Sequence, residues 1–362
     1  MGLCLSGGGY RAMLFHLGTL CRLYEAQLLP KVQRISSVSG GSITAAVLGL
    51  AWDRLSFKPE DMKSKFVPFV IEPVRRLART TIDTGSIIKG VLLPGAVGDR
   101  IAAAYDRHLF KGATLQDLPS SPRFIINATN IQTAALWRFS KPYMGDYRVG
   151  RIPFPAVPLA RAVAASSAFP PVLSPTTIDL DPGSFIPNSG EDLQRVPFTS
   201  KVVLSDGGVY DNLGLETVWK RYRTVLVSDG GGKTRAEEHP HRDWARHAYR
   251  VLDLVDNQVR SMRKRQLIAS YTAAHDQAVR RQGAYWGIRS DIAKYGLSDV
   301  PPCPVSRTSL PAEVPTRLKQ VPDLLQERLI NWGYAVCDAA IRRHVLDTVP
   351  APKGFPYPSS GI

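Results

Sequence analysis

Residues 2–9 of the chain read GLCLSGGG and residues 32–41 read VQRISSVSGG, and these two stretches show how the chain is organised. Each is a short apolar run that ends in small residues, and each is followed by apolar residues at helical spacing. Short apolar runs that alternate with helical patterns are typical of buried strands in a parallel sheet. We therefore expect the first fifty residues to form strand, glycine turn, helix, strand, serine turn and helix.

The turns at the ends of these two strands carry the chemistry. A run of three glycines costs backbone entropy and contributes no side chain to packing, so it is expected where bare amides approach a ligand. The helix N-terminus that follows favours negative charge. Ser39 lies on a sharp strand-to-helix turn with the small residues Ser37 and Gly41 two positions away, which is the pattern of a nucleophile elbow. The two turns predict an anion-binding cradle beside an exposed serine.

Four segments resemble the sequence blocks of the patatin-like phospholipase family. They are SGGGYR at 6–11, SVSGG at 37–41, AASSAFPP at 164–171 and SDGGVYDNLG at 205–214. The blocks lie in family order, and SGGGYR is similar to the cytosolic phospholipase A2 branch. Residues 256–266 and 329–335 also resemble bacterial members. Ser37 replaces the first glycine of the G-x-S-x-G pattern, but serine is small enough for the turn, so activity is still expected.

The resemblance and the strand and helix patterns imply a three-layer α/β/α fold with a mostly parallel central sheet. We expect one patatin-like domain over residues 1–362 with four parts. They are a core at 1–52 and 119–232, a helical insertion at about 53–118, C-terminal helices at about 240–346 and a Pro-rich tail at 347–362. The insertion includes a Gly/Pro-rich stretch at 92–98, and residues 176–199 are predicted to be a surface loop.

Local patterns predict several individual elements. Strands are expected at 123–129, 136–139, 201–204 and 224–227, and helices at 159–168 and 213–222. Two longer helices, at 244–262 and 324–345, are amphipathic. The first carries Trp244, Val251, Val255 and Met262 on its apolar face and a series of arginines on the other face. The arginine face is expected either to contact anionic lipid headgroups or to be a solvated surface.

The resemblance implies that Ser39 is the nucleophile and Asp206 its base, since the family uses a Ser–Asp dyad. A serine hydroxyl is a weak nucleophile at neutral pH and needs a base, and a desolvated carboxylate has the raised proton affinity that suits this task. Asp229 is the rival on chemistry alone, because it too follows a strand and precedes glycines. His239 and His241 are the alternative bases of a conventional esterase.

The resemblance also implies roles for the glycine turn. The backbone amides of Gly7, Gly8 and Gly9 are expected to form the oxyanion hole. Arg11 matches the family's GGGxR arginine and is expected to bind substrate, through a phosphate headgroup or through its field at the oxyanion. The structural alternative is that Arg11 caps the turn or pairs with a carboxylate.

Composition sets broader limits. The chain has 362 residues, 44% of them hydrophobic, and a formal net charge of +15. This charge favours polyanionic partners such as a phospholipid surface, although it is equally typical of a basic soluble protein. No nucleic-acid-binding motif is present. The four cysteines match no metal-site spacing and predict free thiols in a reducing compartment.

The sequence therefore predicts a serine acyl hydrolase that cleaves carboxylic ester bonds of lipids, of phospholipase A or lysophospholipase type, without a metal or organic cofactor. The chain shows neither a signal peptide nor a membrane span, so we expect a cytoplasmic protein with the option of peripheral contact at the inner face of the membrane. The alternatives are an inactive basic protein that binds a membrane or a partner, and a His-using esterase. The oligomeric state stays open.

Overall fold

The computed structural model of the chain describes residues 1–82, 96–171, 173–232, 234, 236–274 and 277–362. In this part of the chain, strand β1 (Gly2–Leu5) lies in a ten-stranded sheet between β2 (Arg34–Ser37) and β9 (Thr224–Asp229). β3 (Arg123–Asn130) pairs with β2 and β10 (Gln282–Gly287) with β9, and all of these pairings are parallel. All four residues of β1 are buried, which explains its unbroken apolar sequence. The predicted parallel arrangement of the central strands is confirmed.

The rest of the sheet is antiparallel. Beyond β3 lie β4 (Ala135–Phe139), β5 (Tyr143–Asp146) and β6 (Gly150–Pro153). The last residues of β3 also pair with β8 (Lys201–Asp206), which pairs in turn with β7 (Thr176–Asp179). The segment 176–199 was expected to be a surface loop throughout, and this is wrong at its start, because β7 is held by ladder hydrogen bonds to β8.

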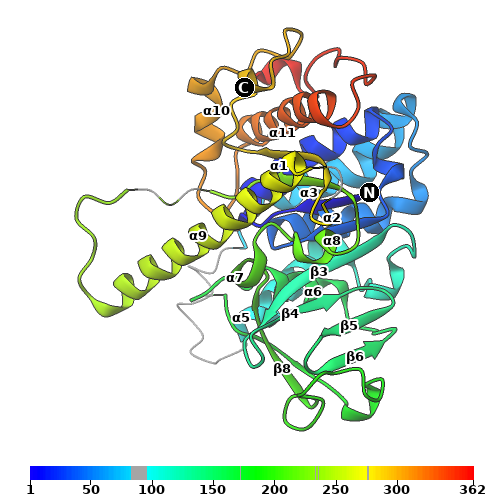
Figure 1. Cartoon of the computed structure of the whole chain (residues 1–362), viewed down its shortest axis with the longest axis vertical. Helices are drawn as coiled ribbons and strands as arrows, with labels where there is room; N and C mark the ends of the chain where they lie inside the picture. The colour runs from blue at the N-terminus through cyan, green and yellow to red at the C-terminus, as the bar shows by residue number, and fades with distance from the viewer. Residues whose placement is uncertain (83–95, 172, 233, 235, 275–276) are drawn as a thin grey trace.

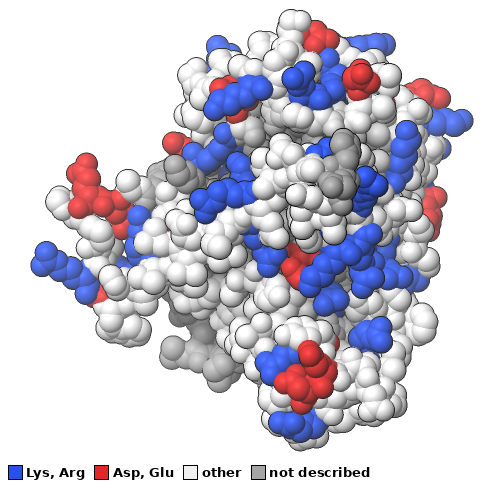
Figure 2. Space-filling model, in the orientation of Figure 1, with Lys and Arg blue, Asp and Glu red and all other residues white. Residues whose placement is uncertain are grey.

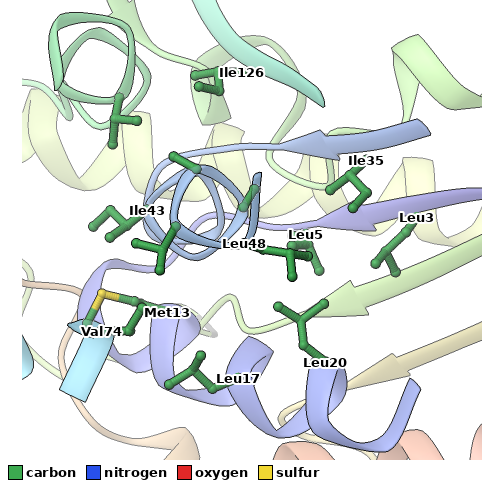
Figure 3. Packing of buried hydrophobic residues seen from close by; sticks show 14 of the residues in the cluster. Leu3, Leu5, Met13, Leu17, Leu20, Ile35, Ile43, Leu48, Val74 and Ile126 are labelled. Carbon is green, nitrogen blue, oxygen red and sulfur yellow. The ribbon is translucent and has the colours of Figure 1, made fainter. Parts of the chain in front are cut away.

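Helices cover one face of the sheet in a large apolar cluster. They are α1 (Gly9–Glu25), α2 (Gly40–Ala51), α3 (Glu72–Ala78) and α11 (Asp323–His344). Figure 3 shows Leu3 and Leu5 of β1 on the same side as Leu17 and Leu20 of α1. Side chains alternate between the two faces of a strand, so Cys4 points to the opposite face.

On that opposite face lie α8 (Glu216–Trp219) and α9 (Trp244–Thr272). Cys4 packs there with Val225, Val218 and Leu267 in a smaller cluster. The two clusters place helices on both sides of the sheet, as the three-layer prediction required. Only the C-terminal part of α9 joins this layer; the rest of the helix projects from the molecule (Figure 1). No helix among the described residues is long and apolar enough to cross a bilayer.

The helix predicted over 213–222 is shorter than expected, because only α8 lies in this range, and a separate short helix precedes it. α7 (Gly208–Asp211) and α8 are separated by Gly214, whose φ is +66°, a left-handed conformation that a continuous helix does not allow. The carboxylate of Asp211 accepts a hydrogen bond from the amide of Glu216 at 2.7 Å, so this side chain caps α8. The other expected helices are α6 (Leu159–Ser166), α9 and α11, and α9 extends ten residues beyond the expected end.

The segment predicted to be a helical insertion contains a π-helix (Met62–Ile71), α3 and α5 (Ala96–Tyr105). α5 packs against α6. Residues 83–95, which include most of the Gly/Pro-rich stretch at 92–98, lie outside the described residues. The division of the chain into a core, an insertion and C-terminal helices stays a proposal. A short helix, α10 (Val305–Ala312), precedes α11.

Helices α1 and α11 cross at a point where both backbones lack a side chain. A Cβ atom on Gly18 would lie 1.9 Å from the carbonyl oxygen of Ile330, and one on Gly333 would lie 1.9 Å from that of Phe15. These distances are far below van der Waals contact, so the two glycines allow an approach that alanine would prevent. The crossing packs α11 against the helix that follows the glycine turn.

We expect Gly18→Ala and Gly333→Ala each to lower the free energy of unfolding by about 1–3 kcal/mol or more, the usual cost of overpacking. The higher helix propensity of alanine alone would raise the free energy of unfolding by up to about 1 kcal/mol. The sign of the measured change therefore distinguishes overpacking from helix propensity. Urea denaturation followed by circular dichroism measures it. Gly354→Ala is the control, because a Cβ there meets no atom within 4 Å. Stabilisation by Gly18→Ala contradicts the prediction.

Candidate active site

Ser39 occupies the turn between β2 and α2 in a strained conformation. Its φ is 51°, in the left-handed region, where a non-glycine residue costs about 1–3 kcal/mol and is often found at functional sites. The turn is closely packed: a Cβ on Gly40 would lie 2.1 Å from the carbonyl oxygen of Gly9, and one on Gly41 would lie 2.4 Å from that of Leu5. The glycines after Ser39 therefore let the elbow lie directly on the glycine turn.

The neighbouring serines donate their hydroxyls to other groups. Ser36 donates to the carbonyl of Gly214 at 2.6 Å, and Ser42 donates to Ser37 at 3.0 Å. Ser37 donates to the carbonyl of Ile125, so the serine that departs from the family pattern is accommodated by hydrogen bonding. These hydrogen bonds distinguish Ser36, Ser37 and Ser42 from Ser39, the predicted nucleophile.

Asp206 ends β8 and is 2% exposed. Its Oδ1 accepts a hydrogen bond from the amide of Gly208 at 2.6 Å, while its buried Oδ2 has no well-formed hydrogen bond with any described residue. The Ser39 hydroxyl lies close enough to lower the pKa of Asp206. A catalytic hydrogen bond is often long or misaligned without substrate, so this arrangement suits proton transfer from Ser39.

Burial sets the protonation of Asp206. Loss of hydration raises its pKa to about 7, with a further upward contribution from the negative charge of Asp256 on α9. The Gly208 amide and the Ser39 hydroxyl oppose this shift. A carboxylate with a pKa near neutral pH is a much stronger base than an ordinary aspartate.

Asp229, the rival base, has both carboxylate oxygens occupied. Oδ1 accepts from the amide of Gly231 at 2.9 Å and Oδ2 from the hydroxyl of Tyr285 at 2.7 Å. Burial alone would raise the pKa of Asp229, but the charge of Arg260 and these hydrogen bonds bring it below its usual value. Asp229 is thus held as a satisfied anion, unlike Asp206.

The segment 164–171 joins the two sides of the site. The Oγ of Ser166, the last residue of α6, accepts a hydrogen bond from the amide of Ser39 at 3.0 Å. The carbonyl of Ser166 accepts from the amide of Gly207 at 3.2 Å, and that of Ala168 accepts from the amide of Asp206 at 2.9 Å. The small residues of this block indicate close packing. Their contacts with Ser39 and Asp206 involve residues far apart in the sequence, so the sequence pattern does not reveal them.

The glycine turn differs in one respect from the expected oxyanion hole. The amide of Gly7 donates to the carbonyl of Asn212 at 3.1 Å, so it is already engaged. Within the described residues, the amides of Gly8 and Gly9 make no such bond. Their φ angles are 144° and 59°, which glycine adopts without strain. Two amides, and not three, are available to an oxyanion beside Ser39.

A buried histidine connects the glycine turn to β9. One ring nitrogen of His16 contacts the hydroxyl of Ser228 at 2.9 Å, and the other contacts the carbonyl of Ser6 at 2.9 Å. Burial lowers the pKa of His16 to about 4, so the ring is neutral. The Oγ of Ser6 accepts from the amide of Gly230 at 2.8 Å, which ties the same turn to the end of β9.

Arg11 is 2% exposed and is surrounded by backbone and hydroxyl groups. Its guanidinium donates to the carbonyl of Gly230 at 3.0 Å, to the carbonyl of Val314, and to the hydroxyl of Thr316 at 2.9 Å. The amide of Tyr10 donates to the carbonyl of Arg317 at 3.1 Å. These contacts favour a structural role, in which Arg11 holds residues 314–317 against the glycine turn. The role in substrate binding stays a prediction.

Among the described residues, the two histidines considered as alternative bases make no hydrogen bond with Ser39. His239 and His241 are exposed in the segment before α9, and His241 contacts Arg246 at 3.2 Å. No hydrogen bond joins either of them to Ser39 or Asp206 in the described part of the chain. The same part contains no group of three or more His, Cys, Asp or Glu side chains that could hold a metal ion.

Comparison with solved structures shows that the fold is known. Human GIVD cytosolic phospholipase A2 superposes with a TM-score of 0.54 at 13% sequence identity, covering 94% of this chain and 61% of that chain. The same human enzyme in complex with methyl gamma-linolenyl fluorophosphonate gives a TM-score of 0.53 at 14% identity, covering 94% of this chain and 57% of that chain. At such low identity the likeness concerns the fold alone.

The sequence comparison identifies the family. No curated protein sequence matches the chain. The family model of patatin-like phospholipase matches residues 3–219, which is more than half of the chain and includes the turns at Ser39 and Asp206. The elbow, the glycine turn and the buried aspartate all lie in the matched region. The chain belongs to the patatin-like phospholipase family.

Proposed function

We propose that the protein is a serine acyl hydrolase that cleaves carboxylic ester bonds of lipids through a Ser39–Asp206 dyad. The observation that carries the proposal is the buried Asp206 carboxylate, which keeps one oxygen without a well-formed hydrogen bond beside the strained Ser39. Family membership supports the ester chemistry. Because the chain spans 61% of the first solved phospholipase chain, its own substrate is part of the proposal.

The reaction proceeds as an acyl transfer in two halves. Asp206 takes the proton of the Ser39 hydroxyl while its oxygen attacks the ester carbonyl, and the amides of Gly8 and Gly9 stabilise the resulting oxyanion. Asp206 then gives the proton to the leaving alcohol, and the acyl group stays on Ser39. Water repeats the sequence, with Asp206 as the base, and releases the fatty acid. Loss of one oxyanion donor typically costs about 100- to 1,000-fold in rate.

The two alternatives receive less support. A His-using esterase needs a histidine next to Ser39, whereas His239 and His241 are exposed and His16 is held between Ser6 and Ser228. An inactive protein on the same fold has no need of a buried carboxylate with one poorly bonded oxygen beside a strained serine, since both features cost stability. The arrangement favours phospholipase A or lysophospholipase chemistry without defining the headgroup.

We expect Ser39→Ala and Asp206→Asn to abolish hydrolysis of a p-nitrophenyl ester and of a fluorescent phospholipid. Removal of a general base typically costs about 100- to 10,000-fold, and removal of the nucleophile also prevents acylation. A fluorophosphonate probe should label the wild type and not Ser39→Ala. Initial rates and labelling, with circular dichroism to verify folding, provide the measurement.

Asp229→Asn is the matched control, because it makes the same substitution at a buried carboxylate that ends another strand of the same sheet, β9. It should keep most of the activity if it folds. The dyad is refuted if Asp206→Asn stays active while Asp229→Asn or His239→Ala is inactive and folded. A folded wild type that neither turns over nor labels supports the inactive binding protein.

The pH dependence should report the ionisation of Asp206. Only the carboxylate form accepts a proton, and burial raises the pKa of this group to about 7. We therefore expect kcat/KM for an uncharged ester to rise about tenfold per pH unit below pH 7 and to level off above it. Asp256→Asn should move the midpoint to lower pH, because it removes a negative charge that raises the pKa of Asp206.

The control for this shift is Asp253→Asn, which makes the same change one turn earlier on α9. The negative charge of Asp253 raises the pKa of Asp256, but Asp253 is not among the groups that shift the pKa of Asp206. A midpoint near the ordinary aspartate value of about 4 would contradict the burial argument, and equal shifts in the two variants would contradict the role of Asp256.

We also propose peripheral contact with anionic membranes through α9. Trp244, Val251, Val255 and Met262 share one side of this helix, because their spacings of seven and four residues match the helical repeat. All four are exposed, Trp244 by 84% and Met262 by 61%. An amphipathic helix with exposed apolar side chains and flanking cations suits the interface of a bilayer. α9 packs against α7, which follows Asp206.

The double variant Trp244→Ser/Met262→Ser should bind vesicles of phosphatidylcholine and phosphatidylglycerol about tenfold more weakly, because two large apolar side chains no longer enter the interface. Co-sedimentation measures binding. Hydrolysis of a soluble p-nitrophenyl ester should be unchanged. The matched control is Phe154→Ser/Val196→Ser, which alters two residues that are 72% and 65% exposed elsewhere. Equal loss of binding in both variants would exclude α9 as the contact.

A further inference from the structure

Two cavities lie next to each other at the end of the sheet where strands β2 and β9 begin. Their volumes are about 360 and 300 Å³, and Lys220 and Arg221 line both. Arg34, the first residue of β2, lines the smaller cavity. Ser39 follows the opposite end of the same strand, so the two cavities are separate from the proposed active site.

The walls of these cavities carry many positively charged side chains and few carboxylates to neutralise them. Arg34, Arg138, Lys220 and Arg221 line the smaller cavity, and Arg223 and Arg280 add to the larger one. Glu216 is the carboxylate in the walls, and it is paired with Lys220 and Arg263. Figure 2 shows a dense group of Lys and Arg side chains over the region that Figure 1 labels α8.

Arg34 lacks a partner for part of its guanidinium. It is 5% exposed, its Nη1 donates to the carbonyl of Thr217 at 3.0 Å, and its buried Nε has no hydrogen bond with any described residue. Arg138 and Arg280 each have a buried Nε in the same condition. Buried donors without acceptors cost free energy, and these three lie in the walls of two adjoining cavities.

The electrostatic environment of Arg34 also favours an anion in the smaller cavity. Its pKa is lowered, chiefly by burial, and the positive charges of Arg221 and Arg123 lower it further. The guanidinium lies over the ring of Tyr222, at 5.6 Å from its centroid, and Tyr222 opposes only part of this lowering of the pKa. An anion in the cavity would reverse each of these unfavourable effects.

We propose that the two cavities form one binding site for a ligand that carries two or more phosphate groups. The guanidinium fork matches the geometry of a phosphate group and binds it through two parallel hydrogen bonds. Arg34 and Arg138 supply such forks in the smaller cavity, and Lys220 and Arg221, shared by both cavities, reach a second phosphate. The ligand is either a soluble polyphosphate or the phosphorylated headgroup of an inositol lipid. The site is independent of the chemistry at Ser39.

Isothermal titration calorimetry at fixed ionic strength tests the proposal, with inorganic tripolyphosphate and inositol 1,4,5-trisphosphate as probes and orthophosphate for comparison. The wild type should bind at least one of the multiply phosphorylated probes at least tenfold more tightly than orthophosphate. The exposed pair Lys220→Gln/Arg221→Gln should weaken that binding at least tenfold. Arg34→Gln should do the same if it folds, which thermal unfolding establishes.

The matched control is Lys58→Gln/Lys63→Gln, which removes the same charge from exposed positions. These residues flank the start of the π-helix that packs on α2, on the opposite face of the sheet from α8. The control should change affinity less than twofold. Equal weakening in both pairs would show that binding follows net charge alone and would overturn the site, as would the absence of binding to both probes.

Vesicles separate the two sources of phosphate. Binding to vesicles with phosphatidylinositol 4,5-bisphosphate that exceeds binding to phosphatidylserine vesicles of equal surface charge, and that is lost in Lys220→Gln/Arg221→Gln, supports a lipid headgroup. Equal binding to the two kinds of vesicle, with binding of a soluble probe still sensitive to Lys220→Gln/Arg221→Gln, supports a soluble polyphosphate. Both results retain the site, and they assign its ligand.

Discussion

The close approach of two backbone turns is the constraint on which the proposed site depends. Residues 7–9 and 39–41 lie so near each other that a Cβ on Gly40 would lie only 2.1 Å from the carbonyl oxygen of Gly9. Such contact is compatible only with glycine, and it brings the glycine turn against the turn that holds Ser39. Strand β1, buried between β2 and β9, holds one turn, and β2 holds the other. The central strands are thus the scaffold of the site.

The aspartates that end β8 and β9 show how the surroundings of a carboxylate set its protonation. Asp229 is buried among an amide, a phenol and the charge of Arg260, so it stays ionised and inert. Asp206 is equally buried but has one amide partner and a second carboxylate, Asp256, in its vicinity. Burial with little compensation raises the pKa of a carboxylate, whereas a nearby positive charge and two hydrogen-bond donors keep a buried carboxylate ionised. Ser166 and Ala168 hold Asp206 in the first of these situations.

Local sequence patterns predicted the central strands β1, β2, β3, β8 and β9 and the turn at Ser39, because buried parallel strands and glycine turns leave a signal within a few residues. They failed where the structure depends on distant partners. β7 exists because β8 pairs with it, and Gly7 is occupied because Asn212 lies opposite. Arg11 contacts residues about 300 positions away. The preference for Asp206 over Asp229 came from family resemblance, and their different partners are visible only in three dimensions.

The position of β1 between strands made early and late in synthesis has a consequence for the nascent chain. β2 follows β1 within about thirty residues, whereas β9 ends at Asp229 and the segment that covers the glycine turn lies near residue 317. At about 5–20 residues per second, roughly 10–45 seconds separate the translation of β1 from that of β9. During this interval the buried strand β1 and the helix α1 are outside the ribosome without β9 and α11, so they are natural substrates for chaperones. The proposed dyad is incomplete for most of that time.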